Sequence, residues 1–153
     1  MVPEHFHLMP ISTNADEMKP YIADEFIREA FELWLKVYPR WGYKLPWVGY
    51  FAINNGQTVG VAGYKGGPKN NTVEIAYGTV PEFEGMGVGT RICRLLVETA
   101  LKDTPGLRVT ARTLPMVSAS TRILEKNNFR KLGIIEDPED GPVWEWLYMG
   151  NEL

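Results

Sequence analysis

Residues 72–100 read TVEIAYGTVPEFEGMGVGTRICRLLVETA. The first nine of these residues are rich in β-branched and aromatic side chains, which predicts a strand. Glycines then occupy alternate positions at 85, 87 and 89, and apolar residues recur at helical spacing from Ile92 to Ala100. The pattern therefore predicts a strand, a glycine-rich loop and a helix that begins near residues 87–90.

A loop of this kind leaves backbone N–H groups unpaired at the positive end of the helix dipole, which suits an anion such as phosphate. No Lys-Ser or Lys-Thr pair follows Gly89, so the loop is not a P-loop. Its glycines run G-x-G-x-G, unlike the dinucleotide-binding G-x-G-x-x-G. On the pattern alone, the loop is either an anion site or a tight turn without a ligand.

Length, net charge and the number of cysteines exclude several classes of function. The chain of 153 residues predicts a single domain, 1–153, and a net charge of −3 argues against broad nucleic-acid binding. We expect no membrane segment, since no apolar run is long enough to cross a bilayer and the N-terminus lacks a signal-peptide pattern. The single Cys93 cannot form an internal disulfide, so we expect a buried structural cysteine and a cytoplasmic location.

Outside residues 72–100, the periodicities predict two more helices, at 20–37 (ended by Pro39) and 115–127. They also predict strands at 5–10, 50–53, 58–64, 107–111, 129–135 and 143–148. The element order is β-α-β-β-β-α-β-α-β-β. This order predicts an α/β fold, mixed in the α+β sense, whose largely antiparallel sheet has helices on both faces.

Residues 38–50 are rich in aromatic side chains with Pro and Gly between them. Such a segment either lines a pocket or caps the core. In the first case Trp41, Trp47 and Tyr50 would bind the substrate. Aromatic faces in an acidic chain favour a cationic, partly apolar substrate.

Two separated motifs now agree with the element order, and over residues 47–148 the chain resembles the GNAT superfamily of acyl-CoA N-acyltransferases. The loop pattern of that family (Gln or Arg, two residues, Gly, one residue, Gly or Ala) falls on residues 84–89. Its later helix motif is matched by Ser120, residues 124–126 and Phe129. Residues 141–146 are similar to the last hairpin of the branch that contains the ribosomal-protein N-terminal acetyltransferases.

Three residues depart from the pattern of the family. Glu84 stands where Gln or Arg is usual, and a carboxylate near a pyrophosphate lowers affinity unless it points away or pairs with a cation. Val117 replaces an Asn that often contacts the pantetheine. Asn128 replaces a Gly, and Asn tolerates the left-handed conformation at a helix end.

The resemblance implies transfer of an acetyl group from acetyl-CoA to a primary amine by direct attack in a ternary complex, without a metal. The strand-loop-helix of residues 72–100 would bind the cofactor: backbone N–H groups of the loop would hold the pyrophosphate, and the strand end would lie along the pantetheine and polarise the thioester carbonyl. The implied cofactor-binding residues are Gly78, Thr79, Val80, Glu84, Gly85, Met86, Gly87, Val88, Gly89, Thr90 and Ser120.

Two side chains are predicted to act in catalysis. Glu74 shares a strand face with the small Ala76 and is a general base or proton relay, a binder of the substrate ammonium, or a surface residue. Ser120 either protonates the leaving thiolate or caps its helix. Many relatives use a tyrosine in this helix where Leu124 stands, and Tyr148 is a second candidate acid.

Other functions stay open at this point. The chain could be a noncatalytic acyl-CoA-binding or sensing module, or a nucleotide-binding regulator that uses the same loop. As an enzyme, it would act on a small-molecule or peptide amine as a monomer or homodimer, with no nucleic-acid or membrane partner.

Overall fold

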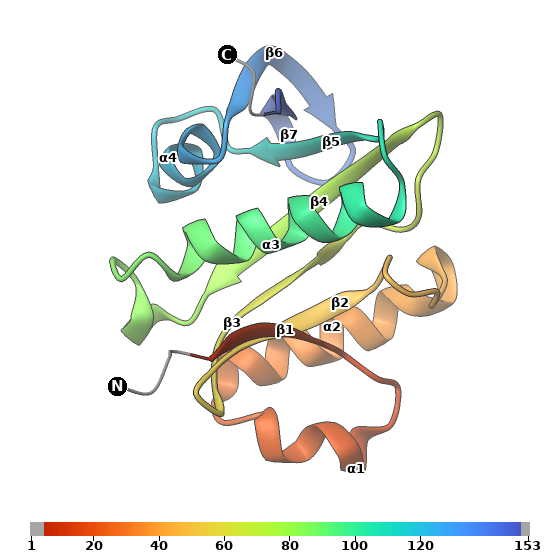
Figure 1. Cartoon of the computed structure of the whole chain (residues 1–153), viewed down its shortest axis with the longest axis vertical. Coiled ribbons are helices and arrows are strands. Elements are labelled where there is room, and N and C mark those ends of the chain that lie inside the picture. The colour runs from red at the N-terminus through yellow and green to blue at the C-terminus, as the bar shows by residue number, and fades with distance from the viewer. Residues whose placement is uncertain (1–4, 151–153) are drawn as a thin grey trace.

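The computed structural model describes residues 5–150. Its seven strands form one sheet with helices on both faces, as Figure 1 shows. The strands are β1 (Phe6–Pro10), β2 (Gly49–Asn54), β3 (Gln57–Tyr64), β4 (Thr72–Thr79), β5 (Arg108–Thr113), β6 (Phe129–Asp137) and β7 (Gly141–Tyr148). The helices are α1 (Ala15–Met18), α2 (Glu25–Trp41), α3 (Val88–Asp103) and α4 (Ala119–Lys126), with 3-10 turns η1 (Lys19–Tyr21) and η2 (Pro81–Phe83). The predicted mixed sheet and the order of its strands with α2, α3 and α4 are confirmed, and α1 is an additional short helix.

The sheet has the strand order β1-β2-β3-β4-β5-β7-β6, and only β4 and β5 run parallel. Their pairing joins residues 72–75 of β4 to residues 108–111 of β5. β4 then continues to Thr79 and β5 to Thr113 without pairing to each other, and Figure 1 shows the two strands diverging. We call residues 72–75 the closed half of β4 and residues 76–79 its open half.

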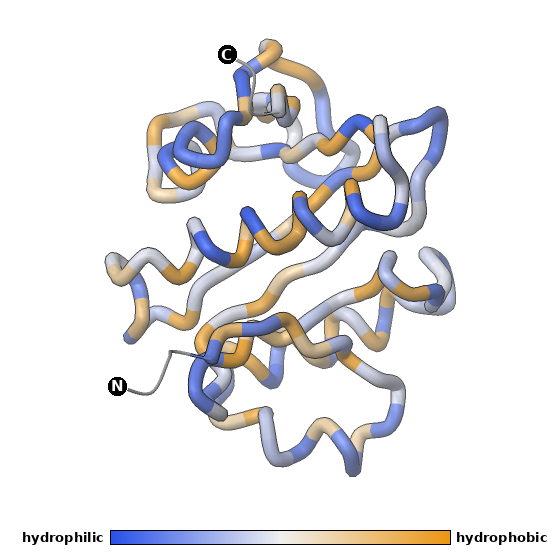
Figure 2. The backbone as a smooth tube through the Cα atoms, in the orientation of Figure 1, coloured by the Kyte–Doolittle hydropathy of each residue, from blue (hydrophilic) through white to orange (hydrophobic). Residues whose placement is uncertain are grey.

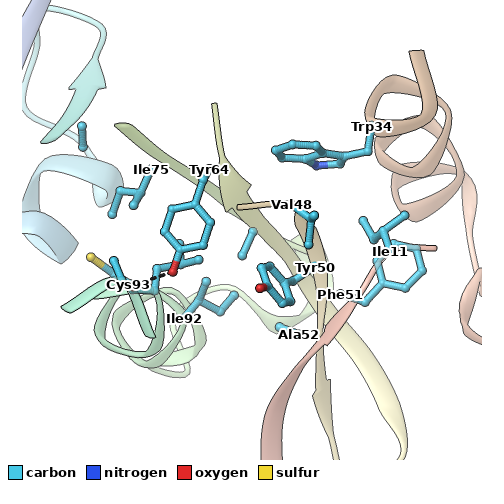
Figure 3. Packing of buried hydrophobic residues seen from close by; sticks show 14 of the residues in the cluster. Ile11, Trp34, Val48, Tyr50, Phe51, Ala52, Tyr64, Ile75, Ile92 and Cys93 are labelled. Atoms are coloured by element: carbon cyan, nitrogen blue, oxygen red, sulfur yellow. Dashed lines mark hydrogen bonds between the residues drawn. The ribbon is translucent and has the colours of Figure 1, made fainter. Parts of the chain in front are cut away.

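Helix α2 packs on one face of the sheet through Trp34. Its indole lies directly over Gly49 and Gly63, which are paired across β2 and β3. A Cβ at either glycine would overlap the indole, so the absence of side chains at these two positions admits the helix. Figure 3 shows Trp34 extending from α2 toward these strands.

Helix α3 covers the other face, where Ile92, Cys93 and Leu96 are fully buried. Hydrophobic and hydrophilic segments alternate along this helix in Figure 2, as expected of a helix with one buried face. The Tyr64 hydroxyl crosses the interface and donates to the Leu96 carbonyl oxygen at 2.6 Å. Cys93 is therefore a core residue, as predicted, and burial raises the pKa of its thiol to about 12.

Both ends of α2 differ from the prediction. Pro39 does not end α2: the helix runs to Trp41, and the Gly42 N–H donates to the Tyr38 carbonyl at 2.7 Å. Pro39 lies in the last turn, where its missing N–H removes a single helical hydrogen bond. The helix also starts later than residue 20, at Glu25, because the Asp24 side chain caps it by accepting from the Ile27 N–H.

Candidate active site

The three loop glycines have two different roles. Gly85 and Gly87 have positive φ angles of 79° and 80°, and open space surrounds the position of a Cβ at each. Gly89 is buried inside α3, and a Cβ there would collide with Ile123 of α4. The first two glycines therefore shape the turn, and the third allows α4 to pack closely against α3.

The backbone N–H groups of residues 85–90 donate no backbone hydrogen bond within the described part of the chain. Gly87 is the N-cap of α3 and provides no side-chain cap, so the first turn of the helix keeps its donors free. The Glu84 side chain is exposed and has no ion pair among residues 5–150, and its N–H donates to the Pro81 carbonyl. This arrangement is a helix N-terminus open to an anion.

The open half of β4 presents backbone groups at its unpaired edge. The Val80 N–H donates to the Val59 carbonyl at 2.9 Å, so it belongs to the pairing with β3. Because N–H and C=O groups alternate in direction along a strand, Tyr77 and Thr79 direct theirs away from β3. Of residues 78–80, which were expected to contact a pantetheine, Thr79 directs its main-chain groups to the open edge together with Tyr77, whereas the Val80 N–H is already used.

Glu74 lies at the end of the closed half and is not a surface residue, since its side chain is 18% exposed. The Lys65 Nζ is 2.8 Å from Oε2, and the Arg112 Nε is 3.7 Å from Oε1. Strand pairing brings these two cations to Glu74. The Lys65 N–H donates to the Glu74 carbonyl, and Arg112 lies two residues after Thr110, which is the β5 partner of Glu74. The carboxylate is thereby held in place by two cations.

Arg112 joins Glu74 to two further carboxylates. Its Nη1 donates to Asp137 Oδ2 at 2.9 Å, and its Nη2 is 3.7 Å from Glu145 Oε2. The N–H of Glu139, the Arg112 guanidinium and a further backbone N–H lower the pKa of Asp137 to about 2. Partial burial opposes protonation of Arg112, but its hydrogen bond to Asp137 and its neighbouring carboxylates raise its pKa. Sequence reasoning found Glu74 but missed Lys65, Arg112 and Asp137.

A pocket of about 650 Å³, the α2 pocket, lies between α2 and the sheet. Glu74 and Trp41 line it, and Trp47 and Tyr50 do not. Trp47 is 8% exposed and packs edge-on against Tyr64, with ring centroids 5.0 Å apart. Tyr50 is also buried, donates its hydroxyl to the Pro46 carbonyl at 2.6 Å, and has a pKa raised by burial to about 12. These two aromatic residues belong to the core, which corrects their assignment to substrate binding.

Ser120 lies at the start of α4, beside a second pocket of about 390 Å³. Ser118 is the N-cap of this helix and forms a capping box with Thr121, so Ser120 is not the cap. The Ser120 hydroxyl forms no hydrogen bond within residues 5–150, and its carbonyl accepts from the Tyr77 hydroxyl at 3.2 Å. Lys65 and Arg112 line both this pocket and the α2 pocket, so the cations that hold Glu74 stand between the two.

Leu124 and the second candidate acid, Tyr148, both pack against hydrophobic side chains. Leu124, at the position of the tyrosine in relatives, is fully buried in the core. The ring of Tyr148 packs against Phe129 with centroids 5.5 Å apart. Among residues 5–150, no three His, Cys, Asp or Glu side chains are grouped as metal ligands would be. No helix in the same range is long and apolar enough to span a membrane.

Solved structures with the same fold include three acetyltransferases. Aminoglycoside acetyltransferase AAC(6')-Ib, in complex with coenzyme A and kanamycin, is 20% identical, with a TM-score of 0.68 over 95% of this chain and 94% of that one. RimL, a ribosomal L7/L12 α-N-protein acetyltransferase in complex with coenzyme A, is 15% identical, with a TM-score of 0.66 over 93% and 92%. The IAA acetyltransferase from Bacillus cereus is 15% identical, with a TM-score of 0.64 over 95% and 98%.

A search of curated protein sequences gives no significant match. The sequence model of the acetyltransferase (GNAT) domain, in contrast, matches residues 2–130. The match includes the free amides of the loop, the open half of β4 and Glu74. The chain is therefore a member of the GNAT acetyltransferase family.

Proposed function

We propose that this protein is an N-acetyltransferase that transfers the acetyl group of acetyl-CoA to a primary amine in a ternary complex. One observation carries the proposal, and it concerns β4. The strand carries a carboxylate in its closed half, has an unpaired backbone edge along its open half, and leads into the free amides at the start of α3. Sites for the amine, the thioester and the pyrophosphate would thus follow one another along β4 and into the loop after it. The complexes of AAC(6')-Ib and RimL with coenzyme A support the cofactor assignment.

The residues present fit acetyl-CoA. The free N–H groups of residues 85–90 suit a pyrophosphate, and the positive φ angles of Gly85 and Gly87 keep side chains away from it. The open edge at Tyr77 and Thr79 suits the amides of a pantetheine arm, which would pair with it as an added strand does. The Glu84 side chain is exposed to water, which screens its charge. It therefore repels a bound pyrophosphate less than a carboxylate directed into the loop would.

Glu74 is the proposed base. The acceptor amine must lose a proton, since its lone pair forms the new C–N bond to the thioester carbonyl as the C–S bond breaks. The proton passes to Glu74, directly or through one water, and the thiolate of CoA takes up a proton from Ser120 or from solvent. Lys65 and Arg112 orient the carboxylate through ion pairs at 2.8 Å and 3.7 Å.

Calorimetric titration with acetyl-CoA, followed by acetylation assays on a panel of amines, tests the proposal. We expect micromolar binding and turnover of at least one primary amine. Absence of binding at millimolar acetyl-CoA would contradict the assignment of the loop. Binding without transfer to any amine would contradict the enzyme and favour the acyl-CoA-binding module.

A further inference from the structure

The two sides of the α2 pocket differ in how their charges are paired. On the sheet side Glu74 and Asp137 are paired with Lys65 and Arg112. On the helix side only basic residues contribute charge, namely Lys36 and Arg40 of α2, which we call the basic rim. The two differ by one helical turn and therefore stand on the same face of α2.

The basic rim is not neutralised by the protein. No carboxylate among residues 5–150 lies within 4 Å of Lys36 or Arg40, in contrast to Lys65 and Arg112. Arg40 has one ring contact, with its guanidinium 5.7 Å from the Trp41 ring centroid. Both side chains are exposed yet line the pocket, so their charges face a molecule that enters it.

Apolar side chains separate the two sides. Leu33, Trp34, Val37 and Trp41 of α2 face Val61, Ala62 and Ala76 of the sheet. Leu33 is 60% exposed and extends the apolar wall outward. An occupant of this pocket therefore meets a carboxylate, then an apolar wall, then free cations.

The charge count argues against a polycationic acceptor. Four basic side chains (Lys36, Arg40, Lys65 and Arg112) and three carboxylates (Glu74, Asp137 and Glu139) line the pocket. A molecule with several ammonium groups, such as the kanamycin bound by AAC(6')-Ib, would place some of them beside the unpaired basic rim. Like charges at such a distance repel and lower affinity.

We propose that the acceptor is an amine that also carries a carboxylate, with an apolar portion between the two groups. Its amine would lie at Glu74 and its carboxylate at the basic rim, where the planar Arg40 guanidinium can donate two parallel hydrogen bonds. A short apolar peptide with free amino and carboxyl ends has this chemistry. This inference names the substrate class of the proposed acetyltransferase and rests on that function.

Matched peptides test it. Di- and tripeptides of alanine and phenylalanine are assayed as the C-terminal acid and as the C-terminal amide, which share the amine and the apolar portion. We expect kcat/KM to be about tenfold higher for the acid, the sum of two partly exposed ion pairs. The double variant K36Q/R40Q removes this preference, and Lys69→Gln, an exposed lysine outside the pocket, preserves it.

The result separates the inference from the function on which it rests. Equal or faster acetylation of the amides by the parent, or slower acetylation of polyamines by K36Q/R40Q than by the parent, overturns the inference and leaves an acetyltransferase. Calorimetry measures peptide binding independently of acetylation. Tighter binding of the acids than of the amides supports the inference even if no amine is acetylated. Equal binding of acids and amides overturns it in either case.

Discussion

The two halves of β4 differ in their neighbours. In the closed half, residues 72–75 are paired to β5, and the side chain of Glu74 is fixed by cations from β5 and from the β3–β4 connection. In the open half, residues 76–79 are paired only to β3, and their other backbone edge is free. One half therefore offers a fixed side chain and the other offers main-chain groups.

Under the proposed function, this difference would let a small domain accommodate two substrates along one strand. Main-chain groups can bind an extended cofactor whatever the side chains are, so departures outside β4, such as Glu84 and Val117, leave the open half unchanged. The closed half depends on particular side chains and would carry the proposed chemistry. Variants in one half should change one function and leave the other, which the following predictions use.

The largest expected effect is that of Glu74→Gln in the closed half. Loss of the base should lower kcat by about 10²–10⁴-fold, while acetyl-CoA affinity stays within about twofold because the open half is untouched. Steady-state kinetics and cofactor titration measure both. Glu98→Gln, an exposed carboxylate on α3, is the matched control and should retain full kcat. A Glu74→Gln enzyme with normal kcat would exclude a proton-transfer role.

At the boundary of the halves, Gly63 pairs with Ala76 beneath the Trp34 indole. Gly63→Ala should lower the free energy of unfolding by about 1–3 kcal/mol, because the added methyl forces the indole to move. Gly78→Ala is the control on the neighbouring strand, where a Cβ would have ordinary contacts of 3.5 and 3.6 Å. Urea denaturation distinguishes them. Equal losses in both variants would contradict the role of Gly63 in seating α2.

Gly87→Ala tests the loop between the open half and α3. A side chain at a left-handed N-cap twists the loop amides away from an anion, so KM for acetyl-CoA should rise by about tenfold with kcat little changed. Gly106→Ala is a matched control, since Gly106 also has positive φ and open space but lies outside the loop. Both variants should lose about 1 kcal/mol of stability. A normal KM in Gly87→Ala would argue against an anion at this helix.

The smallest effect is expected for Asp137→Asn, which removes the carboxylate partner of Arg112. The pKa of Asp137 is lowered to about 2 in the folded state, so its stabilisation is present above about pH 4 and is lost as the pH falls toward 2. The variant should be less stable at pH 7 by about 1 kcal/mol, with water screening part of the effect. Thermal unfolding from pH 7 to 2 should show the two proteins converge in acid, and a constant difference would contradict this linkage.

What the sequence predicted well is local. The glycine spacing, the apolar periodicity of α3 and the turn residues act over a few positions, so the element order and the loop followed from them. The position of Glu74 followed from strand alternation. The resemblance supplied the chemistry.

What the sequence did not reveal depends on contacts between distant residues. Lys65 and Arg112 meet at Glu74, and Asp137 meets Arg112, only because the strands pair in one register, which no local pattern states. Trp41, Trp47 and Tyr50 look alike in composition, but only Trp41 lines the α2 pocket, and the other two complete the core around Tyr64. Whether each of these rings lines the pocket or packs in the core depends on the path of residues 42–49, which the composition does not specify.

The single parallel pairing also sets the order in which the molecule can assemble. β2 and β3 are joined by a tight turn at Asn55 and Gly56, both with positive φ, so this hairpin forms from neighbouring residues. β4 can meet β5 only after the chain has crossed the sheet through α3, a slower event because it closes a long loop. In pulsed hydrogen exchange during refolding, amides of β2 and β3 should therefore gain protection before those of β5. Glu74 would receive Arg112 at this late step, so the proposed base would acquire both of its cationic partners only when the topology is complete.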